Sequence, residues 1–584
     1  MGDGQASGLS AAQAEAHAVL VSHFGANALT LLPQATVNKA GGSGTVGWSL
    51  PLPADHTGSE RSLWIVLASA FPEVAPAVVV VPSAYGVWPH VTFEGGLCTW
   101  YDGMAPVGKS PHDQMKLVLE RVGEILRAIY PTPDPARISE EFAKEWLSYW
   151  LPRDGSVAHA TALLLDVPPP TLRVIPTHTV TMPDRRRFML IGSDAHRANA
   201  WSAAFGVNAP RHDQSLDTLY VPLARPVIGA PTSLPALKQV LDAACPEAVD
   251  LLVERLNATE GPCFVVFGVV GDAPSFAALE LTLVPDMRPQ GSVRNAKEAR
   301  NRRVRRTPDR WRVKVMAVDR ADAGWIHGRA LDLEAQQLAA AHVWVIGCGS
   351  LGGLVIRGLA SAGIGRLTLV DEERLEVPNL GRHVLGVQDL GRYKATALAE
   401  QLRGQLPHLL VDAITKKYPH VRPGIGVEAP DLIVSATANW PADLRLMNAL
   451  TRAEHEWVQL TWAEPHAVAG HSVLADSRSD PRALFSDEGR FLRETTKWPT
   501  TSRTLPGCAG THQPGTFNRL QRIAGLAVEE AIAHLLGRKQ PEHLAWLGDD
   551  VTLQRLGGSW RNDVVAPRGV RERTLSLPIP KRAP

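Results

Sequence analysis

The spacing of hydrophobic residues predicts three stretches with different architectures. The first begins with a helical pattern in SAAQAEAHAVLVSHFG and continues into the β-rich runs ATVNKAGGSGTVGWSLPL, RSLWIVLAS and AVVVVPS, which are typical of an antiparallel meander. Apolar residues then return at helical spacing in PHDQMKLVLERVGEILRAIY, followed by a second helical stretch, ISEEFAKEWLSYWL. One face of the first of these helices is formed by Met115, Val118, Val122, Ile125 and Ile129. Residues 1–160 are therefore expected to fold as helix, antiparallel sheet and helices.

The middle stretch, residues 161–325, has a mixed pattern. CFVVFGVVG and ALELTLVP read as strands, and SLPALKQVLDAACPEAVDLLVERLN reads as one helical segment. An arginine-rich run, NAKEARNRRVRRTPDRWRVKV, is typical of a solvated basic segment, and we assign it no function. The sequence predicts an α/β linker domain of unknown role.

From His342 the pattern alternates between strand and helix. HVWVIG, RLTLVD and DLIVSA are apolar strands, and SLGGLVIRGLASAG and FNRLQRIAGLAVEEAIAHLLG are helical. Such alternation predicts a parallel, doubly wound, Rossmann-like sheet over residues 326–584. The tail segments DVTLQRL and ERTLSLPIP alternate in polarity and are expected to add edge strands. The fold class is thus α/β and α+β, in several domains.

Composition narrows the classes of function. A chain of 584 residues is too long for one core, and 60 basic residues balance 59 acidic ones. We therefore expect no nucleic acid partner, no membrane partner and a cytoplasmic location, since no apolar run is long enough to span a bilayer. The five cysteines contain no CxxC pair, which argues against a tetracysteine zinc site and a disulfide framework: Cys98, Cys245, Cys263, Cys348 and Cys508.

A glycine-rich loop joins the first C-terminal strand to its helix. Gly347, Gly349 and Gly352 form GxGxxG, and Asp371 ends the next strand. Glycines allow phosphate to approach backbone N–H groups, the helix N-terminus favours negative charge, and the acid can hold a ribose hydroxyl. The pattern predicts an adenine nucleotide site, and by itself it leaves NAD and ATP open.

The next segment, VDEERLEVPNLGRHVLGVQDLGRYKATALAEQL, resembles the ThiF/MoeB and ubiquitin-activating adenylyltransferase family over roughly residues 325–540. Asp371, Asn379, Arg382 and Lys394 match the family pattern. The resemblance implies ATP with Mg²⁺ as the bound species, and Arg382 and Lys394 would neutralise a triphosphate and the departing pyrophosphate. Hydride transfer has no such need.

One departure from that family concerns the metal. Where an acidic residue usually follows Thr, this chain reads SATANWPAD, with Ala438 between Thr437 and Asn439. Mg²⁺ needs oxygen ligands, so either another carboxylate such as Asp443 substitutes, or ATP and water hold the ion. The metal ligands stay unknown from sequence, and a degenerate nucleotide-binding scaffold is an alternative interpretation.

Two cysteines near the glycine loop and the closing helix have different predicted roles. Cys348 lies inside the loop, where a small packing side chain suffices. Cys508 lies in TLPGCAGTHQPGTF, directly before the last long helix, where related activating enzymes carry their thioester cysteine. By that resemblance, Cys508 would attack an acyl-adenylate and store the acyl group as a thioester.

The segment FPEVAPAVVVVPSAYGVWPHVTFEGGLCTW resembles the active-site region of ubiquitin-conjugating enzymes, over roughly residues 10–150. His90 replaces the family's Asn eight residues before the cysteine, and Trp88 replaces its His. An imidazole can also donate a hydrogen bond to an oxyanion, so His90 is expected to support transfer out of a Cys98 thioester. The matching positions are Phe71, Pro72, Pro76, Pro89, Gly96 and Cys98.

Together the two resemblances point to bacterial fusions of a ubiquitin-conjugating-like domain with an adenylation domain, as in CBASS antiphage operons. They imply that ATP adenylates the C-terminal carboxylate of a protein with an exposed tail, that Cys508 and then Cys98 carry the acyl group, and that a lysine or other amine accepts it. The modified protein would be a cGAS-like nucleotidyltransferase or a ubiquitin-like protein, and the enzyme a homodimer. A sulfur-carrier adenylyltransferase is a further alternative, which would leave Cys98 unexplained.

Overall fold

The computed structural model describes most of the chain and divides it into two compact units that interleave along the sequence. Met1–Thr161, Pro169–Val174 and Ser215–Val318 form the first unit, and Ala162–Pro168, Ile175–Gln214 and Asp319–Pro584 form the second. Segment 161–325 is thus shared between the units, and the three-part division by sequence stays a prediction. The described residues are 9–41, 44–100, 109–130, 132–150, 160–207, 211–212, 216–258, 261–269, 274–284, 310–328, 332–418, 420–421, 429–452, 454–499, 503–504, 511–512, 515–538, 540–561 and 572–582.

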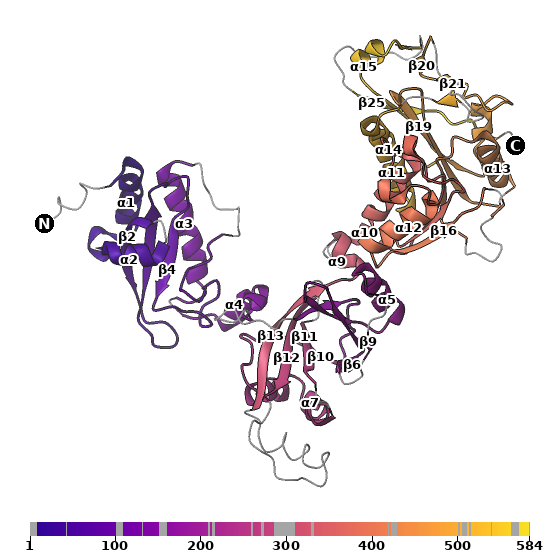
Figure 1. The fold of residues 1–584 in the computed structure, drawn as a ribbon. Coiled ribbons are helices and arrows are strands. Elements are labelled where there is room, and N and C mark those ends of the chain that lie inside the picture. The colour runs from indigo at the N-terminus through magenta and orange to yellow at the C-terminus, as the bar shows by residue number, and fades with distance from the viewer. Residues whose placement is uncertain are drawn as a thin grey trace, which may run out of the picture. The chain divides into compact units, whose positions relative to one another are not determined.

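A four-stranded antiparallel sheet organises the N-terminal part of the first unit (Figure 1). Its strands follow in chain order: β1 (Thr30–Leu31), β2 (Gly44–Leu52), β3 (Arg61–Ala68) and β4 (Ala77–Val81). Helix α1 (Ala11–Phe24) precedes the sheet, and α3 (Pro111–Leu126), α4 (Pro135–Lys144) and the short 3-10 helix η2 (Trp146–Trp150) follow it. Apart from a helix inserted between β1 and β2, the element order is the predicted one, and its assignment to the ubiquitin-conjugating fold stays a prediction.

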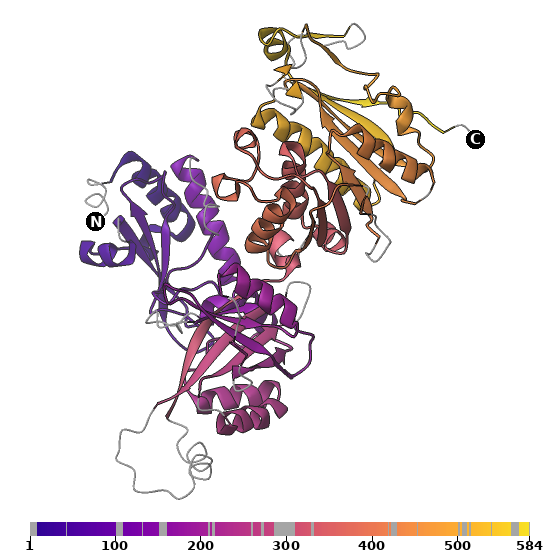
Figure 2. The ribbon, with the colours of Figure 1, turned by 45° about the vertical axis from the view of Figure 1, so that its right-hand side comes forward.

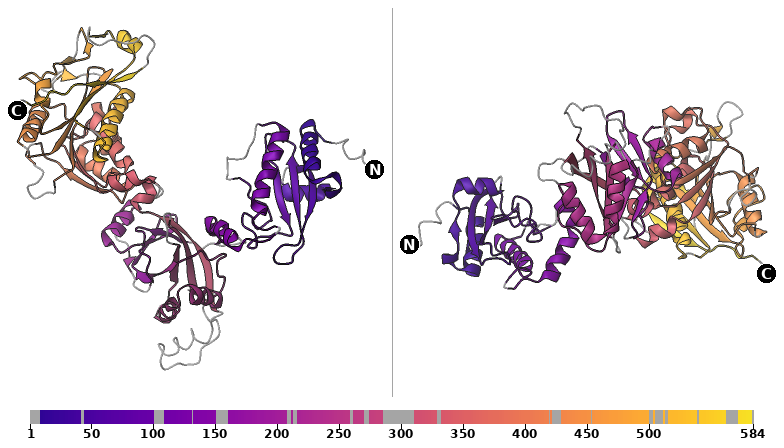
Figure 3. Two further views of the ribbon diagram at one scale, coloured as in Figure 1. Left: turned by 180° about the vertical axis from the view of Figure 1, so that it is seen from behind. Right: turned by 90° about the horizontal axis from the view of Figure 1, so that it is seen from below.

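Helices α1 and α3 lie side by side in this part of the chain (Figure 3). A capping box between Ser10 and Gln13 fixes the start of α1, and Ser110 caps α3 ahead of Pro111. The five predicted apolar residues, four in α3 and Ile129 just beyond its end, are each at most 5% exposed, so the helical spacing in the sequence correctly located the core.

The rest of the first unit contains strands in the order β6 (Arg173–Ile175), β10 (Thr218–Leu223), β11 (Cys263–Val269), β12 (Ser275–Leu283) and β13 (Trp311–Arg320). The stretch predicted as one helical segment is two helices, α6 (Leu234–Ala244) and α7 (Glu247–Ala258). Pro246 lies between them, and its ring and missing N–H are incompatible with a continuous helix. The arginine-rich run up to residue 309 lies outside the described residues.

The second unit contains a small group of strands and a large sheet. The small group has the order β5 (Ala160–Leu164), β8 (Arg187–Ile191), β7 (Thr177–Thr181) and β9 (Arg211–His212), with α5 (Ala195–Ala204) beside it. The large sheet has the order β16 (Leu410–Ile414), β15 (Arg366–Val370), β14 (His342–Ile346), β17 (Leu432–Ser435), β18 (Trp457–Ala463), β19 (Ala469–Asp476), β23 (Glu542–Leu547) and β25 (Arg573–Leu577). The first five of these strands are parallel and the last three antiparallel.

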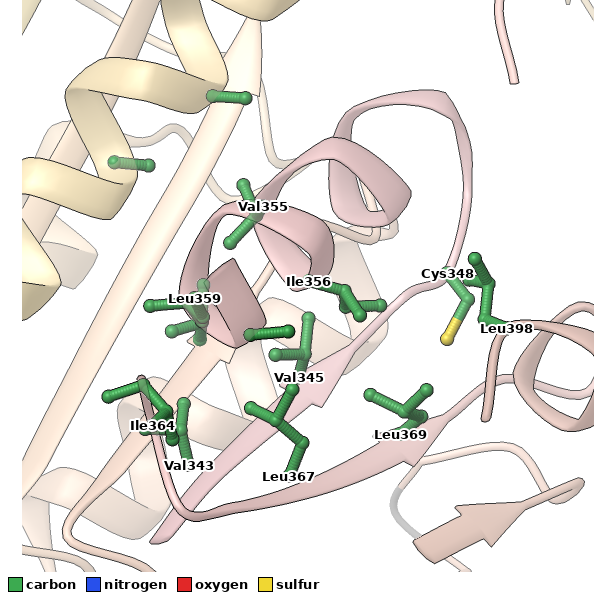
Figure 4. Packing of buried hydrophobic residues seen from close by; sticks show 14 of the residues in the cluster. Val343, Val345, Cys348, Val355, Ile356, Leu359, Ile364, Leu367, Leu369 and Leu398 are labelled. Carbon is green, nitrogen blue, oxygen red and sulfur yellow. The ribbon is translucent and has the colours of Figure 1, made fainter. Parts of the chain in front are cut away.

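Helices cover both faces of the large sheet, as a doubly wound fold requires. On one face, α11 (Ser350–Ala362) and α14 (Phe517–Leu535) pack side by side (Figure 2), and Figure 4 shows Val343 and Val345 beneath Val355 and Leu359 of α11. On the other face, Trp344 joins a core that contains residues of α13 (Trp440–Thr451). The alternation along β14 sends successive side chains to opposite cores. Within the described residues, no helix is both long and apolar enough to cross a membrane.

Two further local predictions were wrong. The segment DVTLQRL, expected as a strand, forms α15 (Asp550–Arg555), because the Asp549 side chain accepts from the Thr552 N–H and caps a helix. The first half of the run ATVNKAGGSGTVGWSLPL forms α2 (Gln34–Gly41), and only its second half is strand β2. The last tail segment does form an edge strand, β25, as expected.

Candidate active site

A cavity opens at the carboxyl ends of the parallel strands β14, β15, β16 and β17. Ligands bind at this edge in doubly wound sheets, because the loops that follow neighbouring strands diverge there. We call it the glycine-loop cavity. Its lining consists of Ile346, Gly347, Gly349, Val370, Asp371, Glu372, Glu373, Lys416, Lys417, Tyr418, Ala436, Thr437, Asn439 and Ala442.

The glycine loop is shaped by close backbone contacts. Gly347 has φ +91°, and a Cβ there would lie 2.8 Å from the carbonyl oxygen of Ala436. At Gly352 a Cβ would lie only 1.9 Å from the carbonyl oxygen of Gly347, so α11 can approach the loop only with glycine at this position. Gly349 precedes α11 without a side-chain cap, which leaves first-turn N–H groups for an anion.

Asp371, directly after β15, is joined to the glycine loop by backbone hydrogen bonds. Its Oδ2 accepts from the N–H of Cys348 at 2.7 Å, and its Oδ1 accepts from the N–H of Glu373 at 2.7 Å. Burial raises the pKa of this carboxyl, and the two amide donors oppose that rise. The carboxylate therefore stands at the cavity wall in a fixed orientation, where the sequence predicted a ribose ligand.

The remaining predicted residues lie outside the cavity lining. Lys394 opens α12 (Lys394–Gln405), is buried, and donates to Oε2 of Glu373 at 2.5 Å. The guanidinium of Arg382 donates to the carbonyl of Pro378 at 3.0 Å. Asn379 accepts from the N–H of Glu376 at 3.0 Å through its side chain. Gly347, Gly349 and Asp371 thus line the cavity, Lys394 reaches it through Glu373, and the roles of Asn379 and Arg382 stay predictions.

Sequence reasoning missed two lysines of the cavity. Lys416 and Lys417 follow the end of β16, and Lys417 lies 3.7 Å from Glu372, which follows β15. The signal was the pair KKY directly after a short apolar strand, since the ends of neighbouring parallel strands meet at one edge. Two further cations at the cavity fit the charge of a nucleotide phosphate.

The segment from Thr437 to Asp443 lacks the acidic residue expected after Thr. Ala438 has φ +48°, in the left-handed region that side chains rarely adopt. Asp443 accepts from the hydroxyls of Ser435 at 2.5 Å and Thr437 at 3.1 Å, and burial raises its pKa. In the described part of the chain, no group of three or more His, Cys, Asp or Glu side chains is arranged to hold a metal ion. The Mg²⁺ ligands stay unassigned.

Cys98 is exposed and lies in a cleft of its own, which we call the Cys98 cleft. Its N–H donates to the carbonyl of His90 at 2.7 Å, while its Sγ lies 3.5 Å from the carbonyl oxygen of Trp100. Gly95 has φ +91°, and a Cβ there would lie 2.4 Å from the carbonyl oxygen of Val80. The glycines before the cysteine thus let the chain run tightly beside β4. The cleft is lined by His90, Cys98, Thr99, Trp100, Leu117, Glu120, Arg121, Glu124 and Glu145.

His90 is held between two carboxylates. Its Nδ1 lies 2.8 Å from Oε1 of Glu145, and its Nε2 lies 2.9 Å from Oε2 of Glu141. The hydrogen bond to Glu145 is the main cause of a raised pKa, which burial opposes. Tyr149 accepts from the backbone N–H of His90 at 3.1 Å. Both ring nitrogens are engaged, so donation to an oxyanion would require one of these contacts to open, and the expected donor role stays a prediction.

Trp88, which replaces the family's histidine, is fully buried. Its indole N–H donates to Oδ2 of Asp55 at 3.1 Å, and Arg61 donates to the same oxygen at 2.7 Å. The guanidinium of Arg61 also donates to the carbonyl oxygens of Pro82 and Ser83 at 2.8 and 3.0 Å. This buried network anchors the loop that precedes His90, so Trp88 acts in folding.

The other cysteines differ in accessibility. Cys348 is fully buried beside Leu369 and Leu398 (Figure 4), and burial raises its pKa well above the ordinary thiol value, which confirms its predicted packing role. Cys263 is also fully buried, and Cys245 is half-buried. Cys508, the predicted thioester residue, lies outside the described residues.

Comparison with known proteins places the large sheet and its cavity in a family. Residues 327–553 match the model of the ThiF family. The C-terminal region is a ThiF-family domain. The match begins before β14 and ends within α15, so it contains the glycine loop, Asp371 and Lys394. The expected similarity of this region to the ThiF family is confirmed, and its ubiquitin-activating thioester chemistry stays a prediction.

Two relatives and one solved structure show how far this similarity extends. A sulfur carrier protein adenylyltransferase of Thermus thermophilus is 28% identical over 208 residues, 35% of this chain and 73% of that protein. The ATP-dependent ubiquitin transferase-like protein Cap2 of Pseudomonas aeruginosa is 31% identical over 248 residues, 39% of this chain and 42% of that protein. The crystal structure of E. coli MccB with ATP has a TM-score of 0.28 at 17% identity, over 44% of this chain and 68% of that one.

The alignments with the relatives cover only parts of the chains compared. The alignment with the Cap2 protein spans less than half of that protein, so its activity as a whole is no more than a proposal for this chain. The ThiF match and the relatives' names support an ATP-using enzyme of the adenylyltransferase class. The N-terminal sheet and Cys98 precede the ThiF match.

Proposed function

We propose that this protein uses ATP to adenylate the C-terminal carboxylate of a protein and conjugates that carboxylate to an amine through two thioesters. The observation that carries the proposal is the presence, in one chain, of a ThiF-family cavity and an exposed thiol in a separate cleft. Activation of the carboxylate needs only the cavity, whereas transfer to an amine through a thioester needs a nucleophile such as the exposed thiol.

The glycine-loop cavity suits the adenylation step. First-turn N–H groups of α11 and the lysines after β16 would bind phosphates, and the Asp371 carboxylate would hold the ribose. Mg²⁺ carried by ATP would supply further charge neutralisation. A C-terminal carboxylate oxygen of the substrate protein attacks the α-phosphorus of ATP. A new O–P bond forms as the bond to pyrophosphate breaks, and the cations stabilise the departing pyrophosphate.

The relay would follow from the chemistry of the two thiols. The thiolate of Cys508 attacks the acyl carbon and AMP leaves with its electron pair; the thiolate of Cys98 then takes the acyl group from Cys508. A neutral amine, such as that of a lysine, attacks the acyl carbon of the Cys98 thioester; the carbon–sulfur bond breaks as the amide bond forms, the Cys98 thiolate leaves with the electron pair, and the amine loses a proton to solvent. The cleft around Cys98 contains three glutamates; Glu124 pairs with Arg121 and Glu145 with His90, and Glu120 would attract a cationic acceptor side chain.

The test of adenylation is ATP–pyrophosphate exchange by the full chain with magnesium present. The parent is expected to exchange label into ATP, and Arg382→Ala and Lys394→Ala are expected to lose this activity. Arg452→Ala is a matched control, because Arg452 is exposed and pairs with Glu454 at 2.8 Å away from the cavity lining. Tight NAD binding without ATP binding in calorimetry would overturn the assignment.

The substrate class is proposed from the resemblance to conjugating fusions of CBASS operons. We favour a cGAS-like nucleotidyltransferase, with a ubiquitin-like protein as the alternative, and a homodimer as the active form. The Thermus relative keeps a sulfur-carrier function open, since the alignment covers 73% of that protein. Incubation with ATP, a sulfide donor and each candidate protein separates these cases: an amide product that depends on Cys98 supports conjugation, and a thiocarboxylate, formed without Cys98 when sulfide displaces AMP from the adenylate, supports sulfur transfer.

A further inference from the structure

A second cavity of about 320 Å³ lies behind the Thr437–Trp440 segment, and the function proposed so far does not use it. Thr437 and Asn439 line the glycine-loop cavity, whereas Ala438 and Trp440 line this second one. The two cavities therefore share one stretch of backbone as a wall. We call the second one the aromatic cavity. Its lining is Ala438, Trp440, Asp443, Leu460, Thr461, Trp462, Ala463, Glu464, Pro465, Phe485, Gly489, Phe491 and Glu494.

Four aromatic rings form its walls. The ring centroids of Trp440 and Phe485 lie 5.4 Å apart, those of Trp462 and Phe491 4.9 Å, and those of Trp462 and Phe485 5.4 Å. Three of the four residues are partly exposed, so ring surface is available to a ligand. Aromatic faces carry negative electrostatic potential and attract cations.

Three carboxylates also line the cavity, and they differ in their partners. Glu464 accepts from both N–H groups and both hydroxyls of Thr495 and Thr496 and from Nε2 of His471. Glu494 pairs with the guanidinium groups of Arg561 and Arg490. The charges of both are therefore compensated by the protein itself.

Asp443 is different. Within the described residues, its hydrogen-bond partners are the two neutral hydroxyls of Ser435 and Thr437, both on Oδ1. Burial raises the pKa of this carboxyl, and the two hydroxyls oppose that rise. Among the described residues that line the cavity there is no basic side chain; Arg482, outside the lining, lies over the Trp440 ring at 5.1 Å and pairs with Asp487 at 2.5 Å. A carboxylate among aromatic rings, without a cation of its own, is complementary to a ligand cation.

We propose that the aromatic cavity binds a guanidinium or ammonium group, namely the basic side chain of a residue near the C-terminus of the protein that is activated. The positive charge of this substrate side chain would lie against Asp443, and its aliphatic stem would lie against Trp440, Trp462 and Phe485. Because the two cavities share the Thr437–Trp440 wall, such a residue would sit a few positions before the carboxylate that enters the glycine-loop cavity. This assignment to a substrate side chain rests on the proposed adenylation.

The cation site can be tested without ATP and without the natural substrate. The probe is Nα-acetylarginine amide, titrated into the full chain and followed by calorimetry, with Nα-acetylcitrulline amide as its uncharged isostere. The arginine probe is expected to bind at least about tenfold more tightly than the citrulline probe, because only it carries charge. Equal affinity of the two probes, or no binding of either, would overturn the proposal.

Variants assign the binding to Asp443. Asp443→Asn keeps the acceptor for both hydroxyls and removes the charge, and it should weaken the arginine probe about tenfold or more. Phe485→Leu removes an aromatic face and should weaken it several-fold, which gives a second test if Asp443→Asn fails to fold. Glu488→Gln is the control. Glu488 is exposed between Phe485 and Phe491, accepts a hydrogen bond from the Ser486 hydroxyl, and lies outside the cavity lining. Unchanged binding in both Asp443→Asn and Phe485→Leu would refute the site.

Two further measurements distinguish the cation site from a metal site and from the proposed adenylation. MgCl₂ alone should leave arginine binding unchanged; competition by Mg²⁺ that disappears in Asp443→Asn would show a metal site instead. ATP–pyrophosphate exchange is measured independently. If the chain binds the arginine probe and shows no exchange, the cation site is supported and the proposed adenylation is wrong. A chain that exchanges pyrophosphate without binding the arginine probe retains adenylation and loses the cation site.

Discussion

The glycine-loop cavity and the Cys98 cleft each contain three carboxylates and differ in the groups set beside them. The cavity adds two lysines and the first-turn N–H groups of α11, and Asp371 is fixed by the loop N–H of Cys348, which suits an anionic nucleotide. The cleft adds a thiol; its Glu124 pairs with Arg121 and its Glu145 with His90, so Glu120 is the glutamate offered to a cationic acceptor. One histidine near the thiol is itself held by carboxylates from a later part of the chain, Glu141 and Glu145. The difference teaches that activation and transfer can be separated by mutation.

The sharpest test of that separation removes one thiol. Cys98→Ala should eliminate the amide product while ATP–pyrophosphate exchange continues, because the glycine-loop cavity is untouched. A reducible adduct should then accumulate on Cys508, whereas Cys508→Ala should keep exchange and leave Cys98 empty. Non-reducing gels with ATP and the cognate protein would show these species, with Cys245→Ala as the control. Loading of Cys98 at the parental rate in Cys508→Ala would mean that the adenylate passes straight to Cys98.

The next test concerns the buried support of the Cys98 cleft. Asp55→Ala leaves Arg61 buried without its partner and removes the acceptor of the Trp88 indole. Loss of one partner of a buried ion pair destabilises a protein by about 3–5 kcal/mol. Hydrogen exchange of β3 amides should report this loss in the free energy of unfolding. Glu73→Gln, an exposed change in the same part of the chain, should be neutral, and an equal effect of both changes would remove the special role of the network.

In the glycine-loop cavity, Asp371→Asn should weaken ATP about ten- to a hundredfold, the range expected when hydrogen bonds to a charged group are lost. The amide side chain cannot accept both loop N–H groups in the same way, and it holds a ribose less strongly. Calorimetric titration with ATP measures the effect. Asp412→Asn is the control, because Asp412 on β16 pairs with Arg366 outside the cavity lining. Parental affinity in Asp371→Asn would contradict the ribose role.

The smallest expected effect is a pH dependence around His90. Its folded pKa is raised, chiefly by Glu145, so the stabilisation by its charged form is complete below the unfolded pKa of about 6.5 and is lost as pH rises through the folded value. The groups that face the ring and its backbone are Glu141, whose other oxygen pairs with Lys144, and Glu145 and Tyr149.

Hydrogen exchange of a peptide covering residues 84–100, corrected for intrinsic rates, should therefore show less protection at pH 9 than at pH 6. Glu145→Gln should lower protection several-fold at pH 6 and change it little at pH 9. A pH-independent effect of Glu145→Gln would show that the residue acts by packing alone.

Single-turnover aminolysis in His90→Ala tests the separate donor role, where loss of one oxyanion donor would slow transfer about a hundredfold.

The sequence by itself determined the features that depend on neighbouring residues. The spacing of apolar residues located the core face of α3, and GxGxxG with Asp371 located the glycine-loop cavity, because a strand end, a tight turn and a helix start are encoded within about 30 residues. Gly352 is required by a close approach of backbone that the GxGxxG pattern already suggested. An exposed Cys98 was expected from its segment alone.

Only the tertiary structure decided which distant groups meet. Glu141 and Glu145 reach His90 across about 50 residues of chain, Lys416 joins the glycine-loop cavity from another strand, and Asp443 lies in a cavity that no motif marks. Such contacts depend on how strands and helices pack, and the same side chain on a helix surface would look identical in sequence whether it met solvent or a partner. Their electrostatic effect, including the raised pKa of His90, follows from burial and distance, which periodicity does not contain.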